Sequence, residues 1–176
     1  MTLFVAFLRG INVGGHIVKK EQLRGAFESL GFQNVVTHKQ SGNVIFETGS
    51  SREVVKPRIE EKLRGSLGFG VTVFLRTIPE LKSIISQDHF NGQEKEDTSF
   101  MVTMLPCHVP KSRLQFPLTI PKSRAEILSA RGSEVFSVTH GGGEGALPNP
   151  FLESKLNVKA TTRNFNIIRE IVQKYS

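Results

Sequence analysis

A glycine-rich stretch directly after the first apolar run is the clearest place for chemistry in this sequence. It reads FLRGINVGGHIVKK over residues 7–20 and combines Arg9 and Asn12 with a run of glycines that includes Gly14 and Gly15. Small residues permit a backbone turn whose amide groups can face an anion near the start of a helix. The stretch therefore predicts a site for a negatively charged group, and the alternative is that the glycines only make the turn.

The same stretch matches only the opening of a nucleotide-binding phosphate loop. Gly10 and Gly15 bracket four residues, as the GxxxxG pattern requires between a strand and a helix. A nucleoside triphosphatase also needs a lysine for the terminal phosphates and a hydroxyl for magnesium, whereas His16 and Ile17 follow here. The sequence thus argues against a triphosphatase and leaves simple anion binding.

A second polar stretch, QSGN, lies between two β-rich runs and predicts a hairpin tip. Gln40, Ser41 and Asn43 would supply neutral hydrogen-bond donors and acceptors there. Asn and Ser commonly pair with loop backbone in turns, so a purely structural role is the alternative.

A third polar stretch, TTRN at residues 161–164, is predicted to start the last helix, with Thr161 or Thr162 as its cap. It contributes Arg163 and Asn164 as candidate ligand contacts. A cation in a first helical turn opposes the helix dipole unless something negative lies nearby. Arg163 therefore indicates a neighbouring carboxylate or a bound anion.

Other catalytic arrangements are weak in this sequence. Ser41 and His38 lie three residues apart in extended chain without an identified carboxylate, so they do not form a triad. Cys107 and His108 are adjacent, and adjacent residues in extended chain point to opposite faces. One cysteine and five histidines show no metal-ligand spacing, so we predict no metal and no cofactor. No feature decides whether the protein is an enzyme.

Composition and charge favour a cytoplasmic globular protein. The chain has 176 residues, of which 38% are hydrophobic and 22% are charged. Its net charge of +7 favours anionic partners, including phosphorylated metabolites and nucleic acid, although the basic residues are spread along the chain. A single cysteine suits a reducing compartment, and the apolar run at the start is too short to span a membrane. We expect no membrane partner, and the oligomeric state is not indicated.

The elements that must position these residues follow a simple order in the first half. Apolar periodicity predicts a strand at residues 2–9, a helix, two strands around QSGN, a second helix opened by a capping box at Ser50 and Glu53, and a strand in GVTVFLRT. This is the ferredoxin-like split βαβ arrangement, βαββαβ. It brings the glycine turn, the QSGN hairpin and the GSLGFG loop to one end of the sheet.

The second half is predicted to be smaller. A polar, turn-rich stretch at residues 88–97 separates a ferredoxin-like α+β domain, residues 1–87, from an α+β subdomain, residues 98–176. The subdomain is expected to be a degenerate copy of the first, with its first helix shortened or lost, followed by a C-terminal helix. HGGGEGALPNP reads as loop, and the path of residues 106–125 is not predicted.

Three stretches carry a resemblance to a known family. LRGINVGG, QSGNVIF and ATTRNFN resemble the signatures of a widespread, mainly bacterial family catalogued as a domain of unknown function, and the resemblance covers essentially the whole chain. It implies an α+β fold and cytoplasmic residence, but no established activity, cofactor or catalytic residue. Phe165 stands where members usually carry tryptophan, and Ile167 where threonine is frequent.

We therefore predict a cytoplasmic protein that binds a small phosphorylated or carboxylated molecule at one end of the first sheet. Two alternatives remain open: an RNA- or DNA-binding protein that uses a basic surface, and an enzyme that acts through paired arginines. The predicted ligand contacts are Arg9, Asn12, Gly14, Gly15, Gln40, Ser41, Asn43, Arg163 and Asn164.

Overall fold

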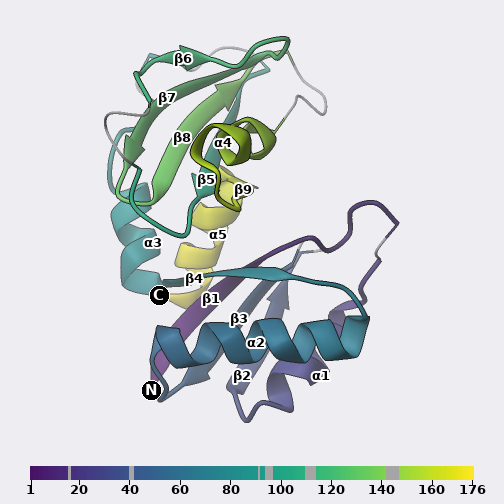
Figure 1. The fold of residues 1–176 in the computed structure, drawn as a ribbon. Helices are drawn as coiled ribbons and strands as arrows, with labels where there is room; N and C mark the ends of the chain where they lie inside the picture. Colours follow the sequence, from purple (N-terminus) through teal and green to yellow (C-terminus); the bar gives the residue numbers. More distant parts are fainter. Residues whose placement is uncertain (16, 40–41, 91, 94–96, 110–113, 142–146) are drawn as a thin grey trace. The chain divides into compact units, whose positions relative to one another are not determined.

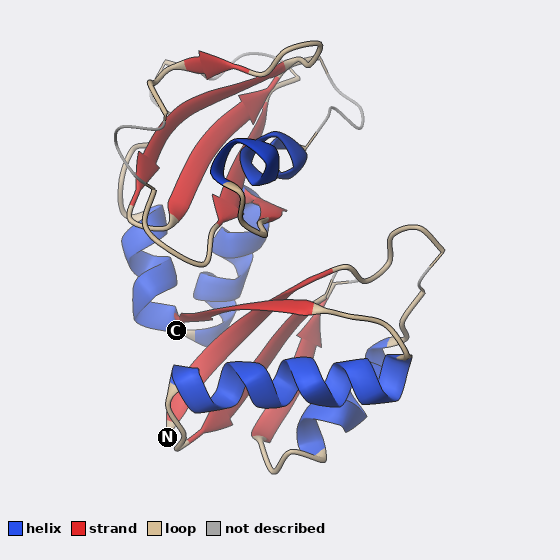
Figure 2. Ribbon diagram, in the orientation of Figure 1, coloured by secondary structure: helices blue, strands red, loops and turns tan. Residues whose placement is uncertain are grey.

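The computed structural model describes the chain except residues 16, 40–41, 91, 94–96, 110–113 and 142–146 (Figure 1). The described residues form an α+β fold of two antiparallel sheets and five helices, including one at the C-terminus (Figure 2). The predicted α+β class is confirmed. None of the helices in the described ranges is both long and apolar enough to cross a membrane.

The chain divides into two compact units, and each is described by itself. The first comprises Met1–Lys82 with Ser176, and the second comprises Ser83–Tyr175. This division falls within one helix and earlier in the chain than the polar stretch at residues 88–97. The boundary drawn from composition stays a prediction.

The first unit has the predicted βαββαβ order. Its elements are β1 (Thr2–Arg9), α1 (Lys20–Glu28), β2 (Gln33–His38), β3 (Asn43–Thr48), α2 (Arg52–Leu67) and β4 (Thr72–Thr77), followed by α3 (Ile78–Ile85). The sheet order is β2-β3-β1-β4, and all neighbouring strands are antiparallel. β2, the strand that follows α1, is therefore not a neighbour of β1, because β3 lies between them.

β1 is central because both of its faces are apolar. Phe4 and Leu8 belong to a core cluster with Phe27 of α1 and Ile59 of α2. Val5 and its neighbours on the opposite face are also buried, as expected for the continuous apolar run at residues 2–9. The strand thus fixes the position of the glycine turn that follows it.

The second unit repeats this topology. Its elements are β5 (Ser99–Met104), β6 (Leu118–Thr119), β7 (Ala125–Arg131), β8 (Glu134–Thr139), α4 (Pro148–Leu156), β9 (Thr161–Asn164) and α5 (Phe165–Tyr175). Four neighbouring strands, β7-β8-β5-β9, repeat the order and the antiparallel pairing of β2-β3-β1-β4. α4 then corresponds to α2, and α5 to α3. Between β5 and β7 the described residues contain β6 but no helix, so the expected degenerate copy is confirmed.

Three local expectations are wrong. TTRN forms strand β9 rather than a helix start, because pairing with β5 and the β-branched Thr161 and Thr162 favour an extended chain. HGGGEGALPNP is not all loop, since its last residues open α4, where Pro148 occupies the first turn without needing an amide. Ser51 rather than Ser50 immediately precedes α2.

Candidate functional site

Three loops meet at one end of the first sheet, as the strand order predicts. The Leu8 amide donates to the Gly42 carbonyl at 2.8 Å, which joins the start of the glycine turn to the hairpin tip. Gly42 has φ of 68° and fits so tightly that an added Cβ would lie 2.5 Å from Ile11 Cδ1. At Gly10, an added Cβ would lie 3.3 Å from the carbonyl oxygen of Gly70 in the loop before β4. The three segments are therefore neighbours.

The backbone of the glycine turn alternates in a way that suits an anion. Gly10, Asn12 and Gly14 have positive φ values of 94°, 53° and 58°, whereas φ at Ile11 and Val13 is not positive; the alternation ends at Gly15, where φ is again positive at 86°. When residues in the left-handed conformation alternate with residues of negative φ, successive backbone N–H groups can point into one small hollow. This arrangement, called a nest, binds anions at many phosphate sites. Added Cβ atoms at Gly14 and Gly15 would meet no atom of the described residues within 4 Å, so this part of the turn is open.

Asn12 holds the base of this turn. Its Oδ1 accepts a hydrogen bond from the Val18 amide at 2.9 Å, across the loop. An Asn side chain tolerates the left-handed backbone that this position requires. Asn12 therefore stabilises the turn by pairing with loop backbone, which was the alternative to a role in ligand binding.

The charge around the converging loops has one sign. Residues 9–20, 38–43 and 67–72 contain no aspartate or glutamate, and their cations are Arg9, Lys19, Lys20 and Lys39. Arg9 is half-buried and the three lysines are exposed. The carboxylate of Glu60 on α2 accepts a hydrogen bond from the Val73 amide at 2.9 Å. The loops themselves thus present only positive side-chain charge.

The hairpin contributes differently from the prediction. Asn43 is only 1% exposed, and its Nδ2 donates to the His38 carbonyl at 3.2 Å. This contact closes the hairpin from inside, so the observed role of Asn43 is structural. Gln40 and Ser41 lie outside the described residues.

The remaining predicted contacts lie in the second unit, on β9. Arg163 is 9% exposed, and its Nη1 donates to Thr161 Oγ1 at 2.8 Å and to the Thr162 carbonyl at 2.9 Å. Burial lowers the pKa of Arg163 to about 10. Asn164 Oδ1 accepts from the Asn166 amide at 2.9 Å, so Asn164, and not a threonine, caps the last helix. The helix-dipole argument for Arg163 does not apply, because the residue belongs to a strand.

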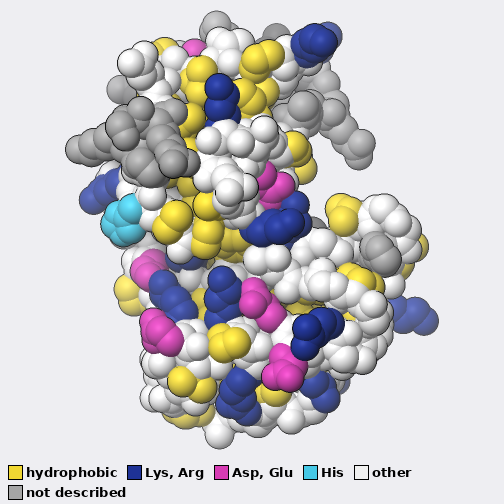
Figure 3. Space-filling model, in the orientation of Figure 1, with side chains coloured by type: hydrophobic (Ala, Val, Ile, Leu, Met, Phe, Trp, Pro, Cys, Tyr) yellow, Lys and Arg dark blue, Asp and Glu magenta, His cyan; other side chains and the backbone are white. Residues whose placement is uncertain are grey.

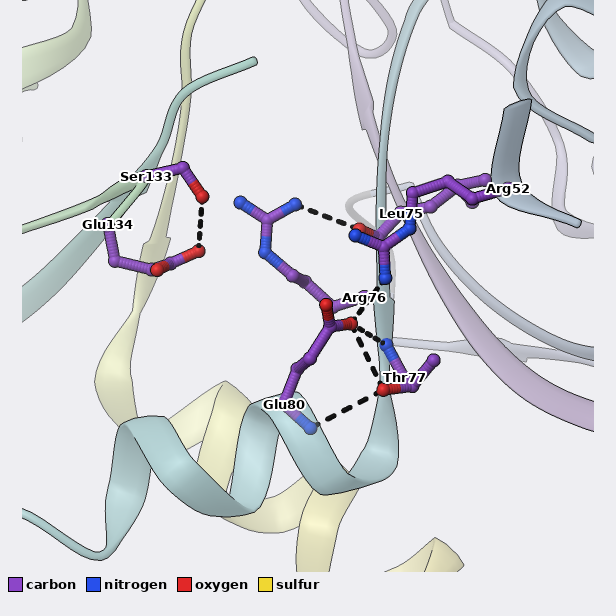
Figure 4. A network of polar contacts seen from close by, with 7 residues as sticks. All are labelled: Arg52, Leu75, Arg76, Thr77, Glu80, Ser133 and Glu134. Carbon is purple, nitrogen blue, oxygen red and sulfur yellow. Dashed lines mark hydrogen bonds and ion pairs between the residues drawn. The ribbon is translucent and has the colours of Figure 1, made fainter. Parts of the chain in front are cut away.

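Sequence reasoning missed an arginine at the corresponding place in the first unit. Arg76 immediately precedes Thr77, just as Arg163 precedes Asn164, and each of the two capping residues ends its strand. Arg76 is 7% exposed, and its Nη1 donates to the Leu75 carbonyl at 2.8 Å (Figure 4). The signal available in the sequence was an arginine followed by a helix-capping residue at both strand-to-helix junctions.

Thr77 and Glu80 form the junction between β4 and α3. The Glu80 carboxylate accepts from the Thr77 amide at 2.7 Å and from Thr77 Oγ1 at 3.0 Å, and it pairs with Arg52 (Figure 4). Thr77 Oγ1 in turn accepts from the Glu80 amide at 3.4 Å. This reciprocal arrangement is a capping box, with Thr77 as the N-cap of α3.

Among the described residues, no group of three or more His, Cys, Asp or Glu side chains is placed to hold a metal ion. The glycine turn of the first unit places backbone amides beside positive side chains, and both kinds of group can interact with an anion.

Comparisons with known proteins identify a family and a protein of similar structure. The model of a family described as a protein of unknown function, DUF1697, matches residues 1–136. The conserved bacterial protein SP0830 from Streptococcus pneumoniae has a similar structure, with a TM-score of 0.69 and 18% sequence identity over 98% of this chain and 97% of that chain. At that identity the likeness concerns the fold alone. No curated protein matches the chain. The expected membership of a family of unknown function is confirmed: the chain belongs to the DUF1697 family.

Proposed function

We propose that the first unit binds a small phosphorylated or carboxylated molecule at the loop end of its sheet. The observation that carries the proposal is the alternating positive φ at Gly10, Asn12 and Gly14 in loops that contain no acidic residue. Backbone amides turned toward one point bind an anion without a dedicated side chain. The binding element is therefore the turn itself.

The side chains around the turn would add strength and selectivity. A guanidinium can bind a phosphate or carboxylate through two parallel hydrogen bonds, and Arg9 ends β1 beside the turn. Lys19 and Lys20 follow the turn and act as exposed point charges that attract an anion from solution. The open surroundings of Gly14 and Gly15 allow a ligand to approach the backbone closely.

Nucleic acid is the second candidate, because the net charge is +7. On the face drawn in Figure 3, however, Lys and Arg side chains are interspersed with Asp and Glu rather than gathered in one patch. Val13 and Ile17, 59% and 85% exposed, also give the loop an apolar surface that a phosphate backbone would not need. A small anion therefore fits better than a polyanion. Catalysis through paired arginines would need substrate turnover to support it.

Titration with inorganic phosphate, followed by amide chemical shifts, tests the proposal. We expect saturable shifts in the glycine turn, and a loss of affinity of about tenfold in Arg9→Ala, the cost of a charge-assisted hydrogen bond. Arg24→Ala is the matched control, because Arg24 is exposed on α1 and pairs with Glu28 at 3.3 Å. Unchanged affinity in Arg9→Ala would exclude the arginine, and shifts confined to other elements would exclude the site.

A backbone variant tests the turn separately from the arginine. Gly14→Ala places a side chain at φ of 58° in open space, so it disturbs the alternation without a clash. Gly31→Ala is its control, with φ of 81°, open space and no place in the converging loops. Only Gly14→Ala should weaken phosphate binding. For the nucleic-acid alternative, affinity for a short duplex would instead fall steeply with salt and survive both loop variants.

A further inference from the structure

The second unit contains a pocket that the proposed function does not use. Its volume is about 330 Å³, and all of its lining residues belong to this unit: Ile85, Ser86, Gln87, Asp88, His89, Phe90, Phe100, Phe165 and Arg169. They come from the end of α3 and the segment after it, from β5, and from the first turns of α5. A volume of this size suits a ligand of metabolite size.

Three phenylalanines are among the residues that line the pocket. The Phe90 ring centroid lies 4.6 Å from that of Phe100 and 4.9 Å from that of Phe165, the latter in an edge-to-face arrangement of 68°. Phe90 and Phe165 are each 6% exposed, whereas Phe100 is half-buried. Clustered rings of this kind favour a planar apolar group, which can extend the edge-to-face packing.

Two opposite charges line the same pocket without pairing with each other. Arg169 is exposed, and its guanidinium carbon lies 5.5 Å from the Phe165 ring centroid. Among the described residues this guanidinium forms no ion pair. Asp88 is also exposed, and within the described part of the chain its Oδ1 accepts one long hydrogen bond, of 3.4 Å, from the Phe90 amide. Both charges are therefore available to a ligand.

His89 adds a rigid, uncharged wall. Its ring stacks on Phe136, with centroids 3.5 Å apart and an interplanar angle of 8°. Its Nε2 lies 3.1 Å from the Ile84 carbonyl, and a carbonyl can only accept, so Nε2 carries the ring proton. Burial lowers the pKa of His89 below its usual value and so favours the neutral form of the ring. The ionic groups of the pocket are thus one cation and one anion.

From this combination we infer that the second unit binds a small zwitterion with an aromatic body, the chemistry of an aromatic amino acid. The ring would lie against Phe100, the most exposed of the three phenylalanines, the carboxylate would pair with Arg169, and the ammonium would pair with Asp88. A ligand with only one charge would leave one of these two side chains without a partner. The inference goes beyond the anion site, because it concerns other residues in the other unit.

Three related probes separate the contributions of ring and charges. L-phenylalanine carries both charges, 3-phenylpropionate lacks the ammonium, and phenethylamine lacks the carboxylate. By titration calorimetry and by chemical shifts of residues 85–90 and 165–169, L-phenylalanine should bind most tightly. Each truncated probe should bind about fivefold more weakly, the scale of one partly exposed charged contact.

Two variants should exchange the preference among these probes. Arg169→Gln should weaken the binding of L-phenylalanine and of 3-phenylpropionate about fivefold and leave that of phenethylamine unchanged. Asp88→Asn should weaken the binding of L-phenylalanine and of phenethylamine by a similar factor and leave that of 3-phenylpropionate unchanged. Lys174→Gln and Asp97→Asn are the controls, since they remove a charge from exposed residues of the same unit outside the pocket. Thermal unfolding of each variant verifies that the fold persists.

The inference fails if L-phenylalanine produces no saturable shift in the pocket up to about 10 mM, a concentration that detects very weak binding. It also fails if all three probes bind equally, or if Arg169→Gln and Asp88→Asn affect them alike. Arg9→Ala should not change the binding of L-phenylalanine, so the outcome is distinguishable from that of the phosphate experiment.

Discussion

The two units share a strand order but differ in the connection after their first strand. In the first unit, the glycine turn and α1 connect β1 to β2. In the second unit, the described residues between β5 and β7 form β6 as their single regular element, and β6 adds an edge strand next to β7. Strand pairing is therefore independent of the first helix. What the first unit gains from its longer connection is a loop with an unusual backbone and only positive charge.

Where the two units agree, the agreement reaches individual side chains. In both units a glutamate of the helix before the last strand accepts a hydrogen bond from an amide at or next to the start of that strand. Glu60 of α2 accepts from the Val73 amide of β4 at 2.9 Å, and Glu153 of α4 accepts from the Ala160 amide just before β9 at 2.8 Å. β4 and β9 are edge strands of their sheets, so these contacts satisfy amides near an otherwise open edge. Such repeated contacts maintain the topology, and ligand sites are to be sought where the units differ.

The largest expected effects come from the equivalent helices α2 and α4. Leu63 and Leu152 are both 0% exposed, each in the core cluster of its own unit. Leu63→Ala and Leu152→Ala should each lower the free energy of unfolding by about 3 kcal/mol, through lost burial and the cavity that remains. Urea denaturation measures the loss. Hydrogen exchange should show reduced amide protection mainly in the unit that carries the change, and equal loss in both would contradict two separate cores.

The hairpins of the two units should respond unequally to the same change. Gly42 and Gly132 both have positive φ, but an added Cβ meets Ile11 Cδ1 at 2.5 Å in the first case, whereas in the second it meets Glu134 Oε2 at 3.5 Å and His108 Cε1 at 4.0 Å, both at ordinary contact distance. We expect Gly42→Ala to cost about 2–4 kcal/mol and Gly132→Ala about 1 kcal/mol, since only the former adds overpacking to backbone strain. Chemical denaturation of both variants provides the comparison. Equal costs would mean that the hairpin tip and the glycine turn are not tightly packed.

The two helix caps should matter less. Thr77→Ala and Asn164→Ala each remove an N-cap acceptor, at a cost of about 1 kcal/mol. Thr77→Ala should lower the free energy of unfolding more than Asn164→Ala, because Thr77 and Glu80 bind each other reciprocally. The Glu80 amide donates to Thr77 Oγ1, and the Glu80 carboxylate accepts from the Thr77 amide. Thermal unfolding at pH 7 measures both, and a larger effect at Asn164 would contradict the ranking.

The Thr77 cap should also depend on pH. Burial acts to raise the pKa of Glu80, but hydrogen bonds from Arg52 and the Thr77 amide outweigh it and leave that pKa below its usual value. The contribution of Glu80 is therefore present at neutral pH and is lost as pH falls through the lowered pKa. In Glu80→Gln the loss of stability between neutral and acid pH should be smaller than in the parent protein.

The smallest effect is expected at His89 in the second unit. Because burial lowers the pKa of this ring, the unfolded chain binds a proton at a higher pH than the folded one. Stability should thus fall as pH decreases from about 6.5 toward the lowered pKa. His89→Phe keeps a ring against Phe136 and removes the titration, so its melting temperature should vary less between pH 7 and pH 5. An unchanged pH profile would argue against a buried, neutral His89.

Apolar periodicity predicted most of the fold because its signals are local. The unbroken run at residues 2–9 and the spacing of Val55, Ile59 and Leu63 specify a central strand and an amphipathic helix directly. β9 was misread because three of its four residues, Thr161, Thr162 and Asn164, have side chains that commonly cap helices, and the pairing with β5 that makes it a strand is not local. α4 was missed because its first turn contains two prolines, at 148 and 150, and its buried face consists of only Pro148, Leu152 and Leu156.

The candidate site was predictable in part for the same reason. Strand order brings the glycine turn to the hairpin, but the burial of Asn43 depends on side-chain packing that no local pattern encodes. The aromatic pocket could not be predicted, because Phe90, Phe100 and Phe165 read individually as core residues. Only the fold places them beside Arg169.

A crystal structure of the full chain grown in inorganic phosphate tests the central claim most directly. The proposal predicts an anion within hydrogen-bond distance of the glycine-turn amides and the Arg9 guanidinium, and its loss from crystals of Arg9→Ala under the same conditions. A glycine turn with no phosphate in crystals that hold phosphate elsewhere on the protein, or an anion that persists unchanged in Arg9→Ala, would contradict it.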